Sequence, residues 1–160
     1  MRALLALVLG AATALAGCMP SAMPAMRVGA DRPPLPGVDV RLSAVDAAGK
    51  GVPVQWQDEK LTLREPPLAS SADIADVRAV QDEYGQTALQ IRYRPEAHQR
   101  IHDGTAAMVG QRMAISVDGR VLMVATVQGP FAESMNLSGL TGSDAEALEK
   151  HITGSVPVKP

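Results

Sequence analysis

The sequence has few aromatic residues, with one tryptophan, two tyrosines and one phenylalanine among 160 residues. Proteins that bind single-stranded nucleic acid commonly stack bases on aromatic rings, so a site of that kind is not expected. Charge of one dominant sign is also lacking, because 15 Lys and Arg face 17 Asp and Glu, for a net charge of −2. No basic field therefore favours nucleic acid or an anionic membrane surface as a partner.

Cysteine is almost absent, since Cys18 stands alone and excludes an intramolecular disulfide. A long hydrophobic run is lacking too: Ala3–Ala16 is uncharged but shorter than the ~20 residues of a membrane-spanning helix. With Met1-Arg2 before it and Leu15-Ala-Gly-Cys18 at its end, this run resembles a bacterial lipoprotein signal. We predict that residues 1–17 are removed and that Cys18 is acylated; the alternative is a conventional signal peptide and a free thiol.

The predicted acyl chains make a lasting membrane anchor, since each buried CH₂ contributes about 0.8 kcal/mol. Met19 stands where an aspartate typically retains lipoproteins at the inner membrane. In a cell with two membranes, we therefore expect an outer-membrane protein that faces the periplasm. Residues 18–37, with five prolines and no hydrophobic periodicity, are predicted to form a flexible tether. Residues 38–160 then suffice for one domain.

Within residues 38–160, hydrophobic patterns of period two alternate with patterns of period 3.6. Asp118-Gly119 between two apolar runs predicts a hairpin with a type I′ turn. Ser70 and Asp73 form a capping-box pattern, which predicts a helix that continues to Tyr84. The other predicted elements are strands at 38–45, 61–64, 87–93 and 133–139, a helix at 96–109 with Ile101, Thr105, Met108 and Val109 inward, and a helix from Thr141 that buries Ala145, Leu148 and Ile152. The fold class is therefore α+β, a mainly antiparallel sheet with about three helices.

Several segments in order carry a family resemblance. Thr105 is followed five residues later by Gly110, then by Ala114-Ile115 and Asp118-Gly-Arg-Val121. The later matching segments are Leu137-Ser-Gly139-Leu-Thr141, Asp144-Ala145, Leu148 and Gly154-Ser-Val-Pro157. Over residues 54–160, this pattern resembles the head subdomain of the large extracytoplasmic region of SecD, a membrane component of bacterial protein export. The resemblance implies an α+β head fold and a link to polypeptides in export.

The chain also departs from the SecD pattern. SecD proteins join this head to a base subdomain and to transmembrane helices, and in the family proton-linked work needs charged residues in those helices. We find neither a base subdomain nor transmembrane helices in this sequence, so we do not expect the protein to act as a proton-driven motor by itself. Ala125 replaces a proline that is usual in the family, and residues 128–133 lack the usual glycines.

Catalytic motifs are not apparent. The sequence contains no Gly-x-Ser-x-Gly elbow, no Cys/His pair and no phosphate loop. His98 and His102 are spaced to bind one metal from a helix face, but Gln99 replaces the glutamate of a His-Glu-x-x-His metalloprotease. Methionines near the anchor have the soft ligands that Cu(I) prefers: Met19, Met23 and Met26. A polar helix rim and an ordinary tether of small residues and prolines explain these patterns better than a metal site does, so we expect no enzyme activity, no metal and no cofactor.

The second strand of the predicted hairpin is apolar on both faces, Val121-Leu-Met-Val-Ala-Thr-Val127. This pattern fits a covered central strand first and an adhesive edge strand second. If the strand lies at an edge, an extended polypeptide can add to it, with Val121, Met123, Ala125 and Val127 as contacts. We therefore expect a non-catalytic module that binds polypeptides or envelope proteins. A metal-dependent hydrolase using His98 and His102, and a purely structural envelope lipoprotein, are the alternatives.

Overall fold

The computed structural model describes residues 30–81 and 85–155, in which all strand pairs are antiparallel. A four-stranded sheet has the order β4-β1-β7-β8, a ribbon pairs β2 with β3, and a three-stranded sheet has the order β5-β6-β9. The strands are β1 (Val40–Ala44), β2 (Val52–Trp56), β3 (Glu59–Leu63), β4 (Ala69–Ser70), β5 (Ile74–Gln81), β6 (Thr87–Tyr93), β7 (Arg112–Val117), β8 (Arg120–Thr126) and β9 (Ser134–Leu137). The predicted α+β class with mainly antiparallel sheets is confirmed.

The described residues form two α-helices rather than about three. α1 (Pro95–Ala106) starts with proline in its first turn, where no backbone donor is lost. α2 (Gly142–Thr153) is capped by the Thr141 hydroxyl, which accepts from Asp144 N at 3.1 Å, and it ends at the left-handed Gly154. Both helices had been predicted. Val109 does not belong to the inward stripe that was predicted for the first helix, because it lies beyond the end of α1 and is 51% exposed.

The helix predicted from Ser70 to Tyr84 is wrong. The capping box is present, with Ser70 N donating to Asp73 Oδ2 at 2.8 Å, but it caps only the 3₁₀ turn Ser71–Asp73. The chain then extends as β5, in which Val77 lies opposite Ile91 of β6. Pairing with β6 determines the conformation here, because β-branched residues fit a half-buried strand better than a helix.

The hairpin of β7 and β8 has its predicted turn, with positive φ angles at Asp118 (49°) and Gly119 (78°). The predicted strands at 87–93 and 133–139 correspond to β6 and β9. β2 is not among the strands expected from the sequence, and it contains Pro53 opposite Thr62 of β3. In a two-stranded ribbon, each strand has an open edge where a proline is tolerated.

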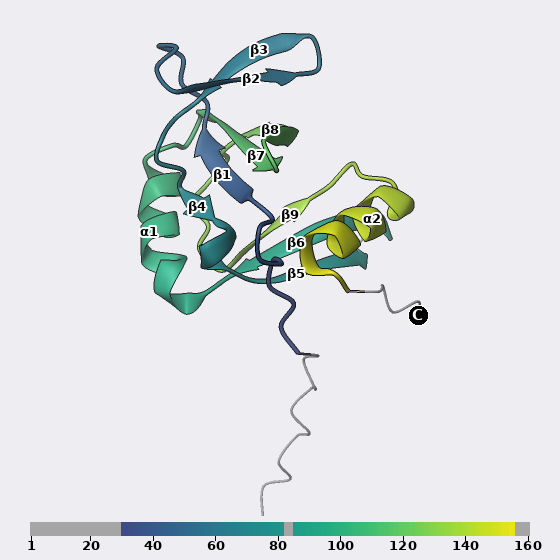
Figure 1. Cartoon of the computed structure of the whole chain (residues 1–160). Coiled ribbons are helices and arrows are strands. Elements are labelled where there is room, and N and C mark those ends of the chain that lie inside the picture. The colour runs from purple at the N-terminus through teal and green to yellow at the C-terminus, as the bar shows by residue number, and fades with distance from the viewer. Residues whose placement is uncertain (1–29, 82–84, 156–160) are drawn as a thin grey trace, which may run out of the picture.

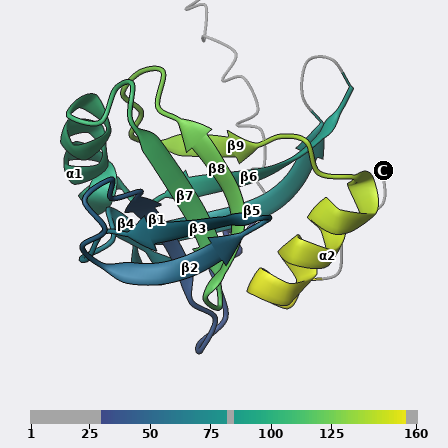
Figure 2. The ribbon, with the colours of Figure 1, turned by 90° about the horizontal axis from the view of Figure 1, so that it is seen from above.

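The elements are arranged as two sheets with the ribbon at one end. Figure 1 shows the ribbon at the top, α1 along one side, and α2 against the three-stranded sheet. Figure 2, from above, shows the ribbon across the four-stranded sheet and α2 beside the β8 side. One core lies between the sheets and contains Leu42, Leu89, Ile101 and Ile152, all at most 2% exposed. A smaller cluster under the ribbon contains Leu63, Ala114 and Val121.

Part of the predicted tether differs from the prediction. Residues 31–35 run against the domain, and Leu35 N donates to Ile152 O of α2 at 2.7 Å. Prolines fix an extended backbone, and such a backbone can pack against a domain as well as form a flexible tether. The number of prolines therefore does not predict whether this segment contacts α2. Residues 1–29, including Cys18, Met19, Met23 and Met26, lie outside the described residues.

Candidate functional site

β8 lies at the edge of the four-stranded sheet and, in the part of the chain that the structure describes, pairs with β7 alone. The interpretation as a covered central strand is therefore wrong, and the edge alternative describes the fold. The chain leaves β8 through residues 127–133 and enters the other sheet at β9, so no later described strand covers this edge. An edge strand presents a row of backbone donors and acceptors that another extended chain can pair with.

The four predicted contact residues do not share one face of β8. Val121 and Val127 are buried, at 7% and 5% exposure, whereas Met123 is half-buried and Ala125 is exposed. Val121 and Met123 face opposite sides of the sheet because the pairing is irregular: Ile115 lies opposite Met123 and Ser116 opposite Val121, which leaves Leu122 unopposed. A bulge of this kind breaks the period-two alternation of side chains along the strand. Val127 lies beyond the end of β8.

A groove of about 620 Å³ separates the start of β8 from α2, and we call it the β8–α2 groove. Three half-buried leucines form its apolar lining: Leu122 from β8, Leu140 from the loop between β9 and α2, and Leu148 from α2. Polar side chains also line it: the charged Asp118, Arg120 and Asp144, together with His151. An extended chain on β8 would therefore run past a depression lined by apolar and polar side chains.

A polar contact bridges the groove between the hairpin turn and the helix. His151 Nε2 of α2 lies 2.7 Å from Asp118 Oδ2, and both side chains are exposed. The same carboxylate accepts from Asp39 N at 2.9 Å, and Asp118 N donates to Asp39 O at 2.8 Å. The backbone donor of Asp39, followed by His151, lowers the pKa of Asp118. The turn is thus fixed to the start of β1, and α2 is tied to the turn.

Several apolar side chains of the described residues are only half-buried, and two of them, Leu122 and Met123, come from β8. They pack on the main core without being covered: Leu122, Met123, Phe131, Met135, Leu140 and Leu148. Two of them are methionines, whose unbranched thioethers adapt to partners of varied shape.

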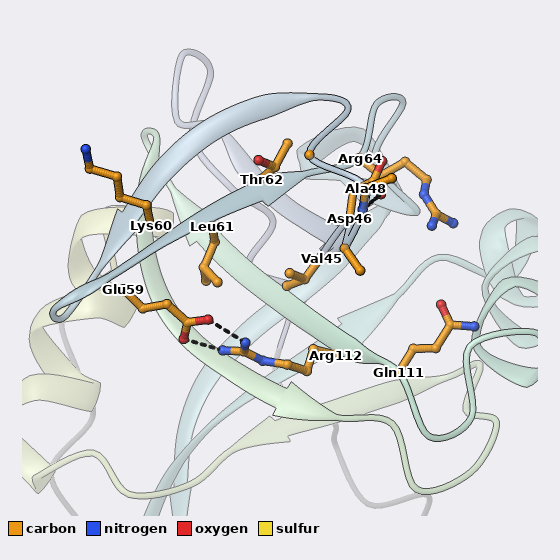
Figure 3. A pocket seen from close by; sticks show the side chains of 12 residues that line it. Val45, Asp46, Ala48, Glu59, Lys60, Leu61, Thr62, Arg64, Gln111 and Arg112 are labelled. Carbon is orange, nitrogen blue, oxygen red and sulfur yellow. Dashed lines mark hydrogen bonds and ion pairs between the residues drawn. The ribbon is translucent and has the colours of Figure 1, made fainter.

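The ribbon forms a second hollow of about 660 Å³ against β7 (Figure 3). A bidentate ion pair joins its sides, with Arg112 Nη1 and Nη2 donating to the two carboxylate oxygens of Glu59 at 2.7 and 2.8 Å. The hydrogen bond from Arg112 lowers the pKa of Glu59. Leu61 and Val45 lie between the ion pair and the loop at Asp46 (Figure 3). Both carboxylate oxygens of Glu59 accept a hydrogen bond from Arg112, so this ion pair holds the ribbon against the four-stranded sheet.

The histidines of α1 do not come together with further ligands. His98 Nε2 lies 3.1 Å from Tyr93 O, while His102 Nδ1 lies 3.2 Å from Asp103 Oδ1 at an exposed position. Among residues 30–81 and 85–155, no group of three or more His, Cys, Asp or Glu side chains is placed to hold a metal. No helix in the same residues has the length and apolar character to span a bilayer.

The family model described as SecDF, P1 head subdomain, matches residues 47–158, which is most of the chain. The chain belongs to the SecDF P1 head subdomain family. The resemblance to the SecD head is thereby confirmed.

Translocase subunits are among the relatives of this SecD head. The chain is 32% identical over 96 residues to the protein translocase subunit SecDF of Thermus thermophilus, and 28% identical over 130 residues to the subunit SecD of Acidaminococcus fermentans. These alignments cover 58% and 78% of this chain, but only 13% and 30% of the relatives. The chain thus spans less than a third of the length of either relative.

Solved structures of SecDF share the fold. One, described as a membrane component that enhances protein export, aligns with a TM-score of 0.56 at 22% identity, over 76% of this chain and 66% of that one. SecDF in a super-membrane-facing form gives a TM-score of 0.53 at 21% identity, over 76% of this chain and 20% of that one. At these identities the likeness concerns the fold.

Proposed function

We propose that this SecD head is a membrane-anchored accessory module that holds extended polypeptides during protein export, without catalysis. The observation that carries the proposal is the open edge of β8 beside the apolar β8–α2 groove, in a domain of the SecDF P1 head family. A polypeptide added to β8 gains backbone hydrogen bonds from the strand and apolar contact from the groove.

The contact set differs in part from the sequence-based one. Val121 is buried in the cluster under the ribbon, and Val127, just after β8, is buried in the main core, so neither is available as a contact. Met123 and Ala125 remain as contacts, and Leu122 joins them because it lines the groove. Backbone pairing is independent of sequence, and the unbranched side chain of Met123 adapts to partners of varied shape, so the module accepts many polypeptides with modest affinity.

The attachment to the membrane is the second part of the proposal. An acylated Cys18 would take the place of the transmembrane helices that hold the head in SecD, and residues 19–29 would set its reach. Met19 after the cysteine favours the outer membrane, with the domain in the periplasm.

Site-specific crosslinking in intact cells tests the polypeptide partner. A photoreactive residue at position 125 is expected to capture polypeptides of many sizes, because Ala125 is exposed on β8. A matched control is position 47, since Ala47 is also an exposed alanine but lies on the loop after β1. Equal capture from both positions contradicts the proposal. A single adduct of constant stoichiometry favours a purely structural envelope protein instead.

A further inference from the structure

The segment before β1, residues 31–36, lies across the outer edge of β5, and we call it the strap. Val77 N of β5 donates to Arg32 O at 3.1 Å, and Arg32 N donates to Asp76 Oδ1 at 2.8 Å. Further along, Leu35 N donates to Ile152 O at 2.7 Å. The strap therefore contacts two elements at once, the edge of β5 and the last turn of α2.

Glu149 of α2 joins the same elements through its side chain. It is 2% exposed, its Oε1 pairs with the Arg32 guanidinium, and its Oε2 accepts from Ala79 N of β5 at 2.8 Å. A buried carboxylate requires a paired cation and hydrogen bonds to offset its desolvation. The cation comes from the strap, so the strap completes the contact that holds α2 on β5.

The opposite side of α2 forms a wall of the β8–α2 groove. Leu148, adjacent to Glu149, lines the groove, and His151 reaches across it to Asp118. A helix transmits displacement as a rigid unit over a few turns, so a change at Glu149 displaces Leu148 as well. The strap and the groove thus lie on opposite sides of one short helix.

We infer that the strap regulates the groove by fixing the position of α2. This inference rests on the proposed docking of polypeptides at β8. With the strap in place, Arg32 neutralises Glu149, α2 stays on β5 and the groove keeps its width. When the strap is drawn away from β5, Glu149 loses its cation, α2 loosens and a bound polypeptide dissociates faster. Because the strap is the segment through which the predicted anchor attaches, tension on the anchor acts on this contact.

The test uses the full chain and two variants, Arg32→Gln and Glu149→Gln. Glu149→Gln keeps an acceptor for Ala79 N and leaves no buried charge unpaired, so it isolates the loss of the strap contact from misfolding. Arg92→Gln is the matched control, because Arg92 also pairs with the strap, at Asp31, but does so at the surface. The readouts are amide hydrogen exchange across α2 and dissociation of a fluorescein-labelled synthetic peptide of alternating leucine and serine.

Both variants are expected to accelerate exchange in α2 and peptide dissociation by at least about tenfold, while Arg92→Gln matches the wild type. Unchanged exchange and dissociation in a wild-type background that binds the peptide overturn the inference and leave the docking site standing. Exchange that rises equally in β7 also overturns it, because that result reports global destabilisation. If the wild type binds no peptide, the proposed function fails, and exchange in α2 still decides whether the strap holds the helix.

Discussion

Single polar residues mark the places where distant segments of this SecD head meet. Thr105 is fully buried in α1; its hydroxyl donates to Ile101 O at 2.8 Å and accepts from Phe131 N at 3.1 Å. Glu149 connects α2, β5 and the strap in a similar way. Such residues fix the relative positions of elements more strictly than apolar contacts do, because hydrogen bonds are directional.

Replacing Thr105 by valine tests this role. The change keeps the shape but removes the acceptor of Phe131 N, so we expect a loss of about 1–3 kcal/mol in the free energy of unfolding. Thr105→Ser is the control, since it retains the hydroxyl and removes only a methyl group. Denaturant unfolding measures the loss, and exchange at the Phe131 amide locates it. Equal exchange of this amide in both variants would show that the hydroxyl does not hold the loop.

A pH dependence is expected from Asp73. Burial raises its pKa, but hydrogen bonds from Ser70 and from Arg100, whose Nη2 lies 2.6 Å away, outweigh burial and lower the pKa overall. A lowered folded-state pKa stabilises the fold above the unfolded value of ~3.9, and this contribution disappears as the pH falls through the folded-state pKa.

Asp73→Ala is therefore expected to cost about 0.5–2 kcal/mol at pH 7. The difference from the wild type should shrink in acid, where the wild-type carboxylate is protonated. Chemical denaturation at neutral and acid pH gives the two values, with the exposed Glu146→Ala as the control. A difference that stays constant with pH would show that the charge of Asp73 does not contribute.

At the residue scale, sequence patterns identified most of the core but not the polar contacts. The apolar stripe of the last helix was predicted as Ala145, Leu148 and Ile152. The buried positions are Ala145, Glu149 and Ile152, whereas Leu148 is half-buried at the groove. Glu149 is tolerated on the buried helix face because it pairs with Arg32, which is 117 residues away in sequence. Local periodicity contains no information on such a pairing.

Among the elements, the β7–β8 hairpin is the one that local chemistry determines most strongly. Its turn requires positive φ at Asp118 and Gly119, and the sequence supplies the residue types that tolerate this conformation. The predicted helix from Ser70 shows the opposite case. The capping box at Ser70 and Asp73 is present, but the conformation of the residues after it depends on pairing with β6. The pattern of residues within that segment does not reveal this pairing.

Gly119→Ala is expected to destabilise the hairpin by about 1–2 kcal/mol, because a side chain is disfavoured at positive φ. Apart from its two chain neighbours, no residue has an atom within 4 Å of the added Cβ, so the cost is conformational alone. Gly129 is the matched control: its Cβ would also meet nothing within 4 Å, and its φ is not positive. Gly129→Ala should leave stability unchanged or raise it by up to about 1 kcal/mol. Equal effects in thermal unfolding would contradict this account of the turn.

At the scale of the whole molecule, the likeness to SecDF concerns one subdomain. The fold class and family were predictable from ordered motifs such as Thr105 to Val121, whereas the edge position of β8 was not. β8 lies at an edge because the chain passes from β8 to β9 in the other sheet. The residues of β8 alone do not reveal which strand follows in space.

Membrane attachment makes a prediction for the whole protein. Cys18→Ser should move the protein from the membrane fraction to the soluble fraction and abolish labelling with radioactive palmitate, since acylation needs the thiol. The measurement is fractionation of cells that express either form. Persistent membrane association of the variant would contradict the anchor and leave the docking proposal unaffected.

The most direct test of the central claim, docking along β8, is hydrogen exchange of the full chain with and without an unfolded polypeptide. The account predicts new protection of amides in Arg120–Thr126 and slower exchange in α2, while the β2–β3 ribbon remains unchanged. Protection confined to the ribbon or to β5, or no protection at any polypeptide concentration, would contradict it.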